Sequence, residues 1–288
     1  MRVVLLHNDS AGSEDHTDAQ LVRLVRRCGH RVVGVAQSMD ELTAALQGGD
    51  IDLVAVAGGD GTVGRTASEL AGWGVPLAIL PLGTANNTAR CLGVSAKLRR
   101  AVEAWAEVEP RRFDLAFLSD GNVRLRFSEA AGWGLFPSVI ARAKRLAKPD
   151  HPRRTIKRDR RLFMRALECK EPCFYELKVD GRDHSGEYLL VEVANIGLIG
   201  PRLEISPQSD PSDGRLEVVM AGESEREALM ELIATGHCPR ELPTARGTHI
   251  ELSSGDGLCH RDGGLIRHPK GVKQFSIDMD PAAVRYLA

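Results

Sequence analysis

The sequence lacks any apolar run that approaches the roughly 20 residues needed to cross a bilayer as a helix. It also lacks an excess of either charge, since 38 Lys and Arg oppose 39 Asp and Glu for a formal net charge of -1. A chain without a strong overall field is not drawn to nucleic acid by its total charge. If the protein meets lipid, we expect it to do so from the membrane surface.

A secretory signal is absent too, because the apolar run at residues 1–7 is too short for one. Six cysteines in a chain of 288 residues do not suggest the disulfide framework of a small secreted domain. We therefore expect reduced cysteines and a cytoplasmic protein. Hydrophobic residues make up 43% of the chain and charged residues 27%, the balance of a globular protein with a buried core.

The N-terminal part of the chain alternates between strand and helix patterns. Strands are predicted at residues 2–7, 31–36, 52–57 and 76–80, and helices at 63–71, from 85 onward and at 94–107. Ser38 is a predicted N-cap. Such alternation is typical of a doubly wound parallel sheet, so we expect an α/β domain at residues 1–120.

The pattern changes after residue 112. Strand-like runs at residues 113–118 and 123–127 flank Ser-Asp-Gly-Asn, which is a hairpin signature. Further short strands are predicted at residues 174–179, 188–194, 216–220, 248–252 and 274–279. We expect residues 121–288 to form a second, mostly antiparallel domain.

A glycine-rich segment follows the third predicted strand and leads into a helix: Gly58, Gly59, Asp60, Gly61 and Thr62. Ligands of open α/β sheets bind at the carboxyl ends of strands, and glycine lets backbone N–H groups approach an anion. This position predicts a phosphate. A carboxylate there would repel phosphate unless a cation lies between them, so Asp60 predicts Mg²⁺. The alternative is an ordinary tight turn at Asp60 and Gly61, although no strand returns after it.

A similar arrangement recurs one strand–helix unit later. Residues 81–87, Pro-Leu-Gly-Thr-Ala-Asn-Asn, follow the fourth predicted strand and open another helix. The motif includes Gly83, followed by Thr84 and Asn86. The last two side chains can donate to a phosphate or a nucleotide while capping that helix. Two such segments beside each other predict one nucleotide site. The alternative is that the asparagines only cap.

These two motifs resemble those of the diacylglycerol kinase catalytic superfamily, which includes sphingosine, ceramide and bacterial lipid kinases. The family pattern is Gly-Gly-Asp-Gly-Thr followed by Pro-x-Gly-Thr-x-Asn. Further matches at residues 4–8, 112–114, 128–134 and 206–216 extend the resemblance over nearly the whole chain.

The resemblance implies an N-terminal domain like the parallel-sheet domain of NAD kinases and phosphofructokinases, and a β-sandwich-like C-terminal domain. It implies ATP and Mg²⁺ as cofactors and a lipid hydroxyl as the phosphate acceptor. Asn8 and residues 58–62 would contact phosphates, and Thr84 would help to hold the nucleotide. NAD kinases share the first motif but not the second, which makes them the nearest alternative.

An acidic loop is the next feature that the resemblance implies. Bacterial members carry a structural metal there, which would correspond to Asp210 and Asp213 with the backbone carbonyl of Arg215. Two carboxylates three residues apart are reasonable ligands for a hard cation. The alternative is a solvent-exposed turn, because Asp-Pro-Ser-Asp-Gly has the composition of one.

The sequence departs from the family near its C-terminus. Members commonly have Asp-Gly-Glu, whose glutamate is the candidate base, and here Gly264 stands in its place. Either Asp262, which matches the family, or His260, a residue type that titrates near neutral pH, takes the acceptor proton. The other possibility is a relative that binds nucleotide or lipid without catalysis. The candidate catalytic residues are therefore Asp60, Asp262 and His260.

A basic segment, Arg142–Arg165, holds eleven Lys and Arg against two Asp. It could engage anionic lipid headgroups, or it could be a solvated helix face. Aromatic residues, which interleave with basic ones on nucleic-acid surfaces, are limited to Phe163. We expect a lipid substrate at a membrane surface, peripheral contact through this segment, and no nucleic-acid partner.

Overall fold

The computed structural model describes residues 1–7, 16–147, 149, 151–255, 257–268 and 273–288. The chain forms two compact units, Met1–Phe113 together with Ala282–Ala288, and Asp114–Pro281. The boundary that we placed near residue 120 lies a few residues after this division. The return of residues 282–288 to the first unit has no counterpart in the sequence-based division.

The first unit contains a parallel sheet with the strand order β2, β1, β3, β4, and the end of β19 pairs beside β4. Its strands are β1 (Arg2–His7), β2 (Arg31–Ala36), β3 (Leu53–Gly58) and β4 (Leu77–Pro81), and its helices are α1 (Asp18–Arg27), α2 (Met39–Gln47), α3 (Asp60–Glu69), α4 (Asn87–Cys91) and α5 (Leu98–Ala104). The predicted parallel-sheet α/β domain is confirmed.

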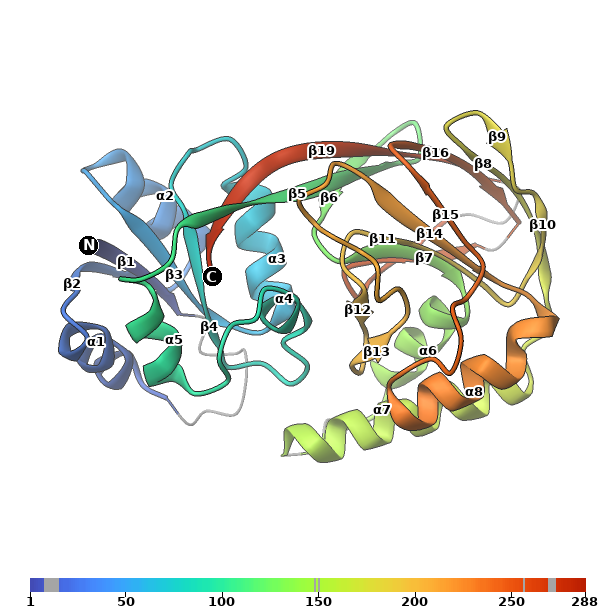
Figure 1. Cartoon of the computed structure of the whole chain (residues 1–288), viewed down its shortest axis with the longest axis horizontal. Coiled ribbons are helices and arrows are strands. Elements are labelled where there is room, and N and C mark those ends of the chain that lie inside the picture. The colour runs from blue at the N-terminus through green and yellow to red at the C-terminus, as the bar shows by residue number, and fades with distance from the viewer. Residues whose placement is uncertain (8–15, 148, 150, 256, 269–272) are drawn as a thin grey trace. The chain divides into compact units, whose positions relative to one another are not determined.

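Helices cover both faces of this sheet (Figure 1), which explains why β3 is buried at every residue. On one face, α1 and α5 pack their apolar side chains, among them Leu21 and Val102, against the sheet. On the other face, α2 and α3 contact the strands. The predicted cap of α2 is confirmed, because the hydroxyl of Ser38 accepts the N–H of Glu41 at 3.2 Å.

The second unit contains two antiparallel sheets. One has the order β10, β8, β16, β19, with β9 beside β8 and β5 joining β6 to β19; the other has the order β15, β14, β11, β7, β17, β18. The bounds are β5 (Pro110–Ser119), β6 (Arg124–Phe127), β7 (Ala130–Gly134), β8 (Cys173–Val179), β9 (Arg182–Asp183), β10 (Gly186–Tyr188), β11 (Leu190–Ala194), β14 (Leu216–Ala221), β15 (Thr244–Gly247), β16 (His249–Ser254), β17 (Leu258–Arg261), β18 (Gly264–Arg267) and β19 (Lys273–Leu287), with a short pair β12 (Leu198–Ile199) and β13 (Leu203–Glu204).

The two sheets enclose an apolar core, in which Trp133 and Phe275 meet edge-to-face with ring centroids 5.1 Å apart. The alternation of buried and half-buried or exposed residues along β8 fits a strand with one face toward this core. The predicted β-sandwich-like domain, including the hairpin of β5 and β6, is confirmed.

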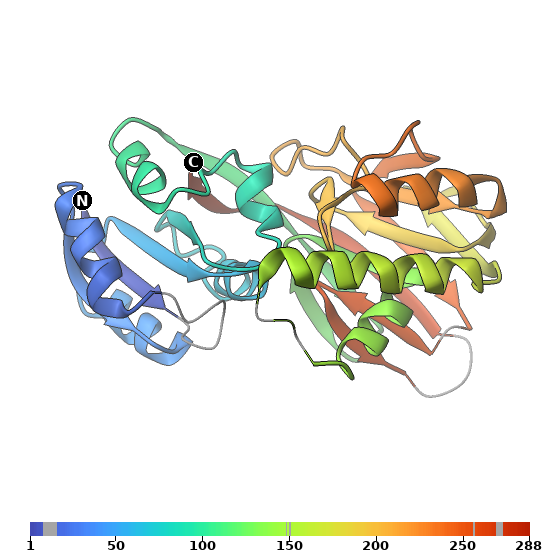
Figure 2. The same cartoon turned by 90° about the horizontal axis from the view of Figure 1, so that it is seen from below.

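Three helices of the second unit lie over the outer face of the sheet that contains β7 and β17 (Figure 2): α6 (Leu135–Ala143), α7 (Pro152–Glu168) and α8 (Arg226–Thr235). We did not predict α6 or α8 from the sequence. The proline in α6, Pro137, lies in its first turn, where a missing N–H costs no helical hydrogen bond.

Residues 282–288 return to the first unit, and the contribution of their packing to stability can be tested. Tyr286 is fully buried and packs edge-on against Phe113, with ring centroids 5.0 Å apart. We expect Tyr286→Ala to lower the free energy of unfolding by about 3–5 kcal/mol, because it removes a large side chain from the core. Urea titration would measure the loss. Tyr286→Phe keeps the ring and should cost much less; equal losses would show that the ring contact does not anchor the segment.

Candidate functional site

The glycine-rich segment of the first unit is the end of a strand followed directly by the first turn of a helix. Gly58 is the last residue of β3, Gly59 is the N-cap of α3, and the helix begins at Asp60 rather than at the predicted residue 63. It begins early because the N–H groups of Thr62 and Val63 both donate to the Gly59 carbonyl at 3.0 Å. The first turn of a helix presents N–H groups without intrahelical partners, which suits an anion.

The two predicted motifs lie against each other. A Cβ built on Gly83 would lie 2.3 Å from the Cα of Gly59, closer than any real contact, and the Leu82 N–H donates to the Gly58 carbonyl at 3.0 Å. Gly58 is constrained as well, since a Cβ there would lie 2.7 Å from the Cβ of Thr62. Glycine at these positions therefore permits the backbones to touch.

Asn86 shapes the second motif. Its side-chain oxygen accepts the Gly83 N–H at 2.9 Å, and its amide group donates to the carbonyls of Gly83 (3.0 Å) and Pro81 (3.2 Å). The residue adopts a left-handed conformation, with φ 53°, and makes no side-chain cap on α4. The expectation that its side chain caps this helix is therefore wrong: Asn86 uses its amide to fold the loop that carries Thr84.

The cap of α4 comes from the other motif instead. Asp60, on the first turn of α3, accepts the N–H of Thr88 at 3.2 Å. The same carboxylate therefore stands at the N-terminal ends of two helices, where backbone dipoles attract negative charge. Sequence reasoning identified Asp60 but missed Thr88, because the contact depends on how two separate turns pack.

The candidate Asn8 lies outside the described residues. The preceding residue, His7, ends β1 beside Ala57 of β3, and its ring contacts the carboxylate of Asp18. Asp18 also accepts the side-chain amide of Gln37 at 2.6 Å. These contacts fix the carboxyl end of β1, next to the strand that carries the glycine-rich segment.

In the second unit, Asp262 lies in the turn between β17 and β18 and has a left-handed φ of 47°. Its carboxylate accepts the backbone N–H groups of Ser128 (2.9 Å), Glu129 (2.8 Å) and Ala130 (3.3 Å), as well as the Ser128 hydroxyl (3.3 Å). Burial raises the pKa of this carboxyl, while the hydrogen bonds from Ser128 and Glu129 oppose that rise. Asp262 thus holds the turn onto the segment that enters β7.

His260 lies in β17, two residues before Asp262, and is buried. Its Nε2 is 2.9 Å and 3.1 Å from the two carboxylate oxygens of Glu192 in β11. Both residues pair with Gly132 of the intervening strand β7, and a Cβ on Gly132 would lie 2.2 Å from the Glu192 carboxylate. The pair meets only because that position has no side chain. Phe136 of α6 stacks on the imidazole with centroids 5.8 Å apart. Glu192 is a residue that sequence reasoning missed.

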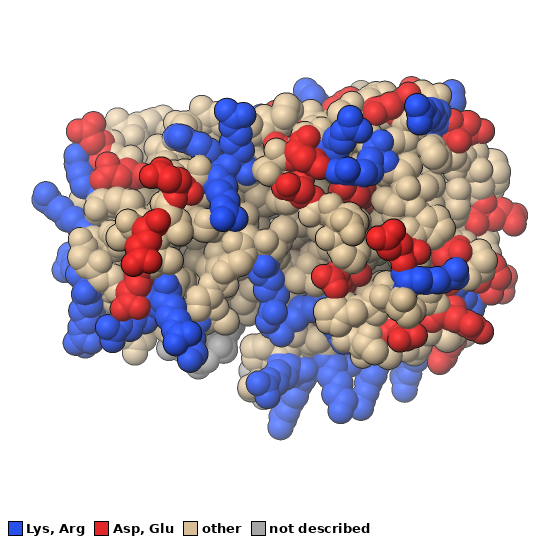
Figure 3. Space-filling model, viewed as in Figure 1, with Lys and Arg blue, Asp and Glu red and all other residues tan. Residues whose placement is uncertain are grey.

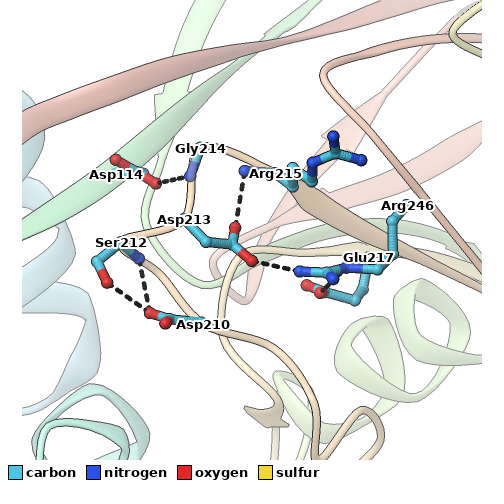
Figure 4. Close-up of polar contacts among 8 residues, drawn as sticks. All are labelled: Asp114, Asp210, Ser212, Asp213, Gly214, Arg215, Glu217 and Arg246. Atoms are coloured by element: carbon cyan, nitrogen blue, oxygen red, sulfur yellow. Dashed lines mark hydrogen bonds and ion pairs between the residues drawn. The ribbon is translucent and has the colours of Figure 1, made fainter.

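The acidic loop, which carries the candidate metal residues Asp210, Asp213 and Arg215, lies close to Asp114 (Figure 4). Asp210 accepts the N–H (2.9 Å) and hydroxyl (2.6 Å) of Ser212, and Asp114 accepts the Gly214 N–H at 2.7 Å. Among the described residues, no group of three or more His, Cys, Asp or Glu side chains is arranged to hold a metal ion.

The basic segment, Arg142–Arg165, runs from the end of α6 into α7. Arg160 donates to the carbonyls of Pro201 (3.2 Å), Arg202 (2.8 Å) and Ala234 (3.3 Å), so it joins α7 to the end of α8. Beside it is an open groove of about 530 Å³, whose lining includes Arg153, Lys157, Arg161, Ile156, Met164 and Ile233. Figure 3 shows basic side chains gathered along the edge where Figure 1 draws α7.

No helix in the part of the chain that the structure describes is long and apolar enough to cross a membrane.

Comparison with known proteins matches both parts of the chain. Residues 2–118 match the family model described as "Diacylglycerol kinase catalytic domain", and residues 139–286 match the "YegS C-terminal NAD kinase beta sandwich-like domain". A diacylglycerol kinase of Mycobacterium tuberculosis (strain ATCC 25618 / H37Rv) is 32% identical over 228 residues, which cover 77% of this chain and 69% of that protein. The chain belongs to the diacylglycerol kinase family.

Two further proteins match nearly the whole length of this member of the diacylglycerol kinase family. A protein of Pectobacterium atrosepticum described as "Probable lipid kinase YegS-like" is 25% identical over 296 residues, covering 98% of this chain and 94% of its own. A crystal structure of a diacylglycerol kinase from Bacillus anthracis str. Sterne has a TM-score of 0.71 at 18% identity and covers 99% of this chain and 96% of its own. The second likeness concerns the fold alone.

The contact between the two motifs gives a prediction about stability. Gly83→Ala should force the two turns apart and lower the free energy of unfolding by roughly 2 kcal/mol, the usual cost of inserting a group into a packed site. Gly61→Ala is the matched control, because nothing lies within 4 Å of a Cβ there and alanine favours a helix. Thermal unfolding of both variants would measure the difference. If Gly83→Ala were as stable as Gly61→Ala, the described contact would be wrong.

Proposed function

We propose that this kinase-family protein uses ATP and Mg²⁺ to phosphorylate a hydroxyl of diacylglycerol or a related lipid. The observation that carries the proposal is the pair of helix starts, at α3 and α4, that the Asp60 carboxylate joins. Backbone N–H groups at such starts bind phosphate, while a carboxylate beside them calls for a cation. In this proposal Gly58 to Thr62 and Gly83 to Asn86 surround the phosphates.

Phosphoryl transfer needs positioning, charge neutralisation and one proton acceptor. The lipid oxygen forms a bond to the γ-phosphorus as the bond from that phosphorus to the β–γ bridging oxygen breaks. ADP leaves, and the lipid hydroxyl gives its proton to a base. Bound Mg²⁺ would neutralise phosphate charge, and Asp60 is the residue that would hold it. Thr84 would position the nucleotide from the loop that Asn86 folds.

Asp262 is the candidate base in this proposal, with His260 second. Asp262 is partly exposed, whereas His260 is only 3% exposed and faces Glu192. Burial raises the pKa of Asp262, which suits a group that takes up a proton, while the backbone donors oppose the rise and favour the ionised form that accepts it. His260 and Glu192 would then act by holding β17, and with it the turn at Asp262, in place.

Asp60 gives a test that separates charge from fold. We expect Asp60→Asn to keep an oxygen for the Thr88 N–H, and so to unfold at nearly the same temperature as wild type, but to lose the charge that a cation needs. Transfer of label from radioactive ATP into the organic phase, with diacylglycerol, phosphatidylglycerol, sphingosine or ceramide as acceptor, should fall by about 10²–10³-fold. Wild-type transfer equal to that of the variant would contradict the assignment of Asp60.

Two alternatives give different results in the same assay. A relative without catalysis, which Gly264 motivates, would be stabilised by Mg-ATP in thermal unfolding yet label no acceptor. An enzyme for a soluble acceptor such as NAD would place the label in the aqueous phase. Neither result would support the lipid kinase proposal.

We further propose that the protein works in the cytoplasm and contacts an anionic membrane through Arg142–Arg165. Within this segment, Arg153, Lys157 and Arg161 recur every four residues and so lie along one stripe of α7, together with Ile156 and Met164. A groove with cationic and apolar walls fits the phosphate and first methylene groups of an anionic lipid. Each basic group near such a surface contributes about 1 kcal/mol.

Charge reversal tests whether the groove or the charge of the whole helix matters. We expect Lys157→Glu with Arg161→Glu to reduce co-sedimentation with phosphatidylglycerol vesicles by at least about tenfold, since two groups at about 1 kcal/mol each are lost. Arg154→Glu with Arg165→Glu makes the same charge change on exposed residues of α7 that do not line the groove. Neutral phosphatidylcholine vesicles are the second control. Equal losses in the two double variants would contradict a role for the groove.

A further inference from the structure

Arg246 stands opposite the acidic loop at a position that the sheet fixes. It lies in β15, which pairs with β14, and its direct partner across the strands is Glu217. Its Nε lies 3.0 Å from Glu217 Oε1, while Nη2 contacts Asp213 Oδ2. Asp213 uses its other oxygen, Oδ1, to accept the Arg215 N–H at 2.9 Å. One guanidinium group therefore joins the loop to two neighbouring strands (Figure 4).

Several other polar groups of the loop are also paired within the protein. The Asp210 carboxylate turns back onto Ser212, and the Gly214 N–H donates to Asp114. The Asp114 N–H in turn donates to the Pro211 carbonyl at 2.6 Å. These contacts fold the loop with groups that belong to the chain itself.

A divalent ion fits this arrangement poorly. Mg²⁺ and Ca²⁺ take six or more oxygen ligands at short distances, and Asp210 and Asp213 would be the carboxylates that supply them. Here both oxygens of Asp213 are engaged, one of them by a guanidinium. A second cation at that oxygen would be repelled by the positive charge of Arg246. In the ligand set that the family resemblance implies, both oxygens of Asp213 and one oxygen of Asp210 are therefore already engaged by groups of the protein.

We propose that Arg246 is the resident cation of the acidic loop and takes the place of a divalent metal ion in holding it. Glu217 is almost fully buried, at 1% exposure, so removing Arg246 would leave a buried carboxylate beside Asp213 without a counter-charge. Such a pair of carboxylates would then have a reason to recruit a divalent ion. The inference goes beyond the proposed function, because it concerns neither nucleotide nor lipid.

Thermal unfolding without nucleotide tests the inference, in EDTA and in millimolar MgCl₂ or CaCl₂. The wild-type midpoint should be the same in all three solutions. We expect Arg246→Met to lower the midpoint in EDTA by roughly 5 °C, a moderate value because the Arg246 side chain is 45% exposed. Part of that loss should be recovered with Mg²⁺ or Ca²⁺. Arg182→Met removes the same charge from an exposed hairpin of the same unit and should show neither effect.

Each other result would overturn the inference. A wild-type midpoint that rises with either ion, and that rises equally in Asp60→Asn, would show that the loop binds a metal despite Arg246. An Arg246→Met variant that unfolds like wild type, or that is destabilised without any response to the ions, would show that the guanidinium does not stand in for one. If Arg246→Met fails to fold, Arg246→Lys retains the charge without the planar fork, and the inference requires that it fold and stay insensitive to both ions.

Discussion

The backbones of Gly59 and Gly83 pack directly against each other in the first unit, and the arrangement around this contact depends on the absence of two side chains. Because a Cβ on Gly83 would lie 2.3 Å from the Cα of Gly59, no other residue type fits there without displacing one turn. The contact brings the first turn of α3 against the turn before α4, and only then does Asp60 reach the N–H of Thr88. In the second unit, Gly132 has a similar role: because it has no side chain, Glu192 and His260 can contact each other across the strand that lies between them.

The sequence was informative where a feature depends on local pattern. The four strands of the parallel sheet, several longer strands of the second unit, the Ser38 cap and the neighbouring glycine-rich turns follow from hydrophobic periodicity and from the position of glycine after a strand. The strands β15, β17 and β18 and the short strands β9, β12 and β13 were not predicted. It was less informative about boundaries: α5 is shorter than predicted, and α3 begins at its glycine-rich segment rather than after it. Glu192 and Arg246 could not be found this way, because their roles depend on which strands become neighbours and in what register.

Three of the four carboxylates with a predicted chemical role have clearly different surroundings in the structure, although the sequence alone does not distinguish them. Asp60 joins two helix starts, Asp262 is held by consecutive backbone N–H groups, and Asp213 is paired with a guanidinium. An acid next to a helix dipole remains a natural ligand for a cation that accompanies phosphate. Asp213, with one oxygen on a backbone N–H and the other on a guanidinium, mainly organises its neighbours. Sequence motifs single out these acids, whereas their partners in the structure decide which chemistry each can perform.

The return of residues 282–288 to the first unit has a consequence for how the protein is made. Synthesis proceeds from the N-terminus, and domains generally fold as the chain emerges. The first 113 residues leave the ribosome early, yet the edge of their sheet beside β4 and the aromatic partner of Phe113 come from residues that are translated after the whole second unit. The first unit therefore keeps an unpaired strand edge until the second unit has been synthesised. An exposed edge of this kind invites pairing with other chains, so the order of translation makes the folding of one unit depend on the completion of the other.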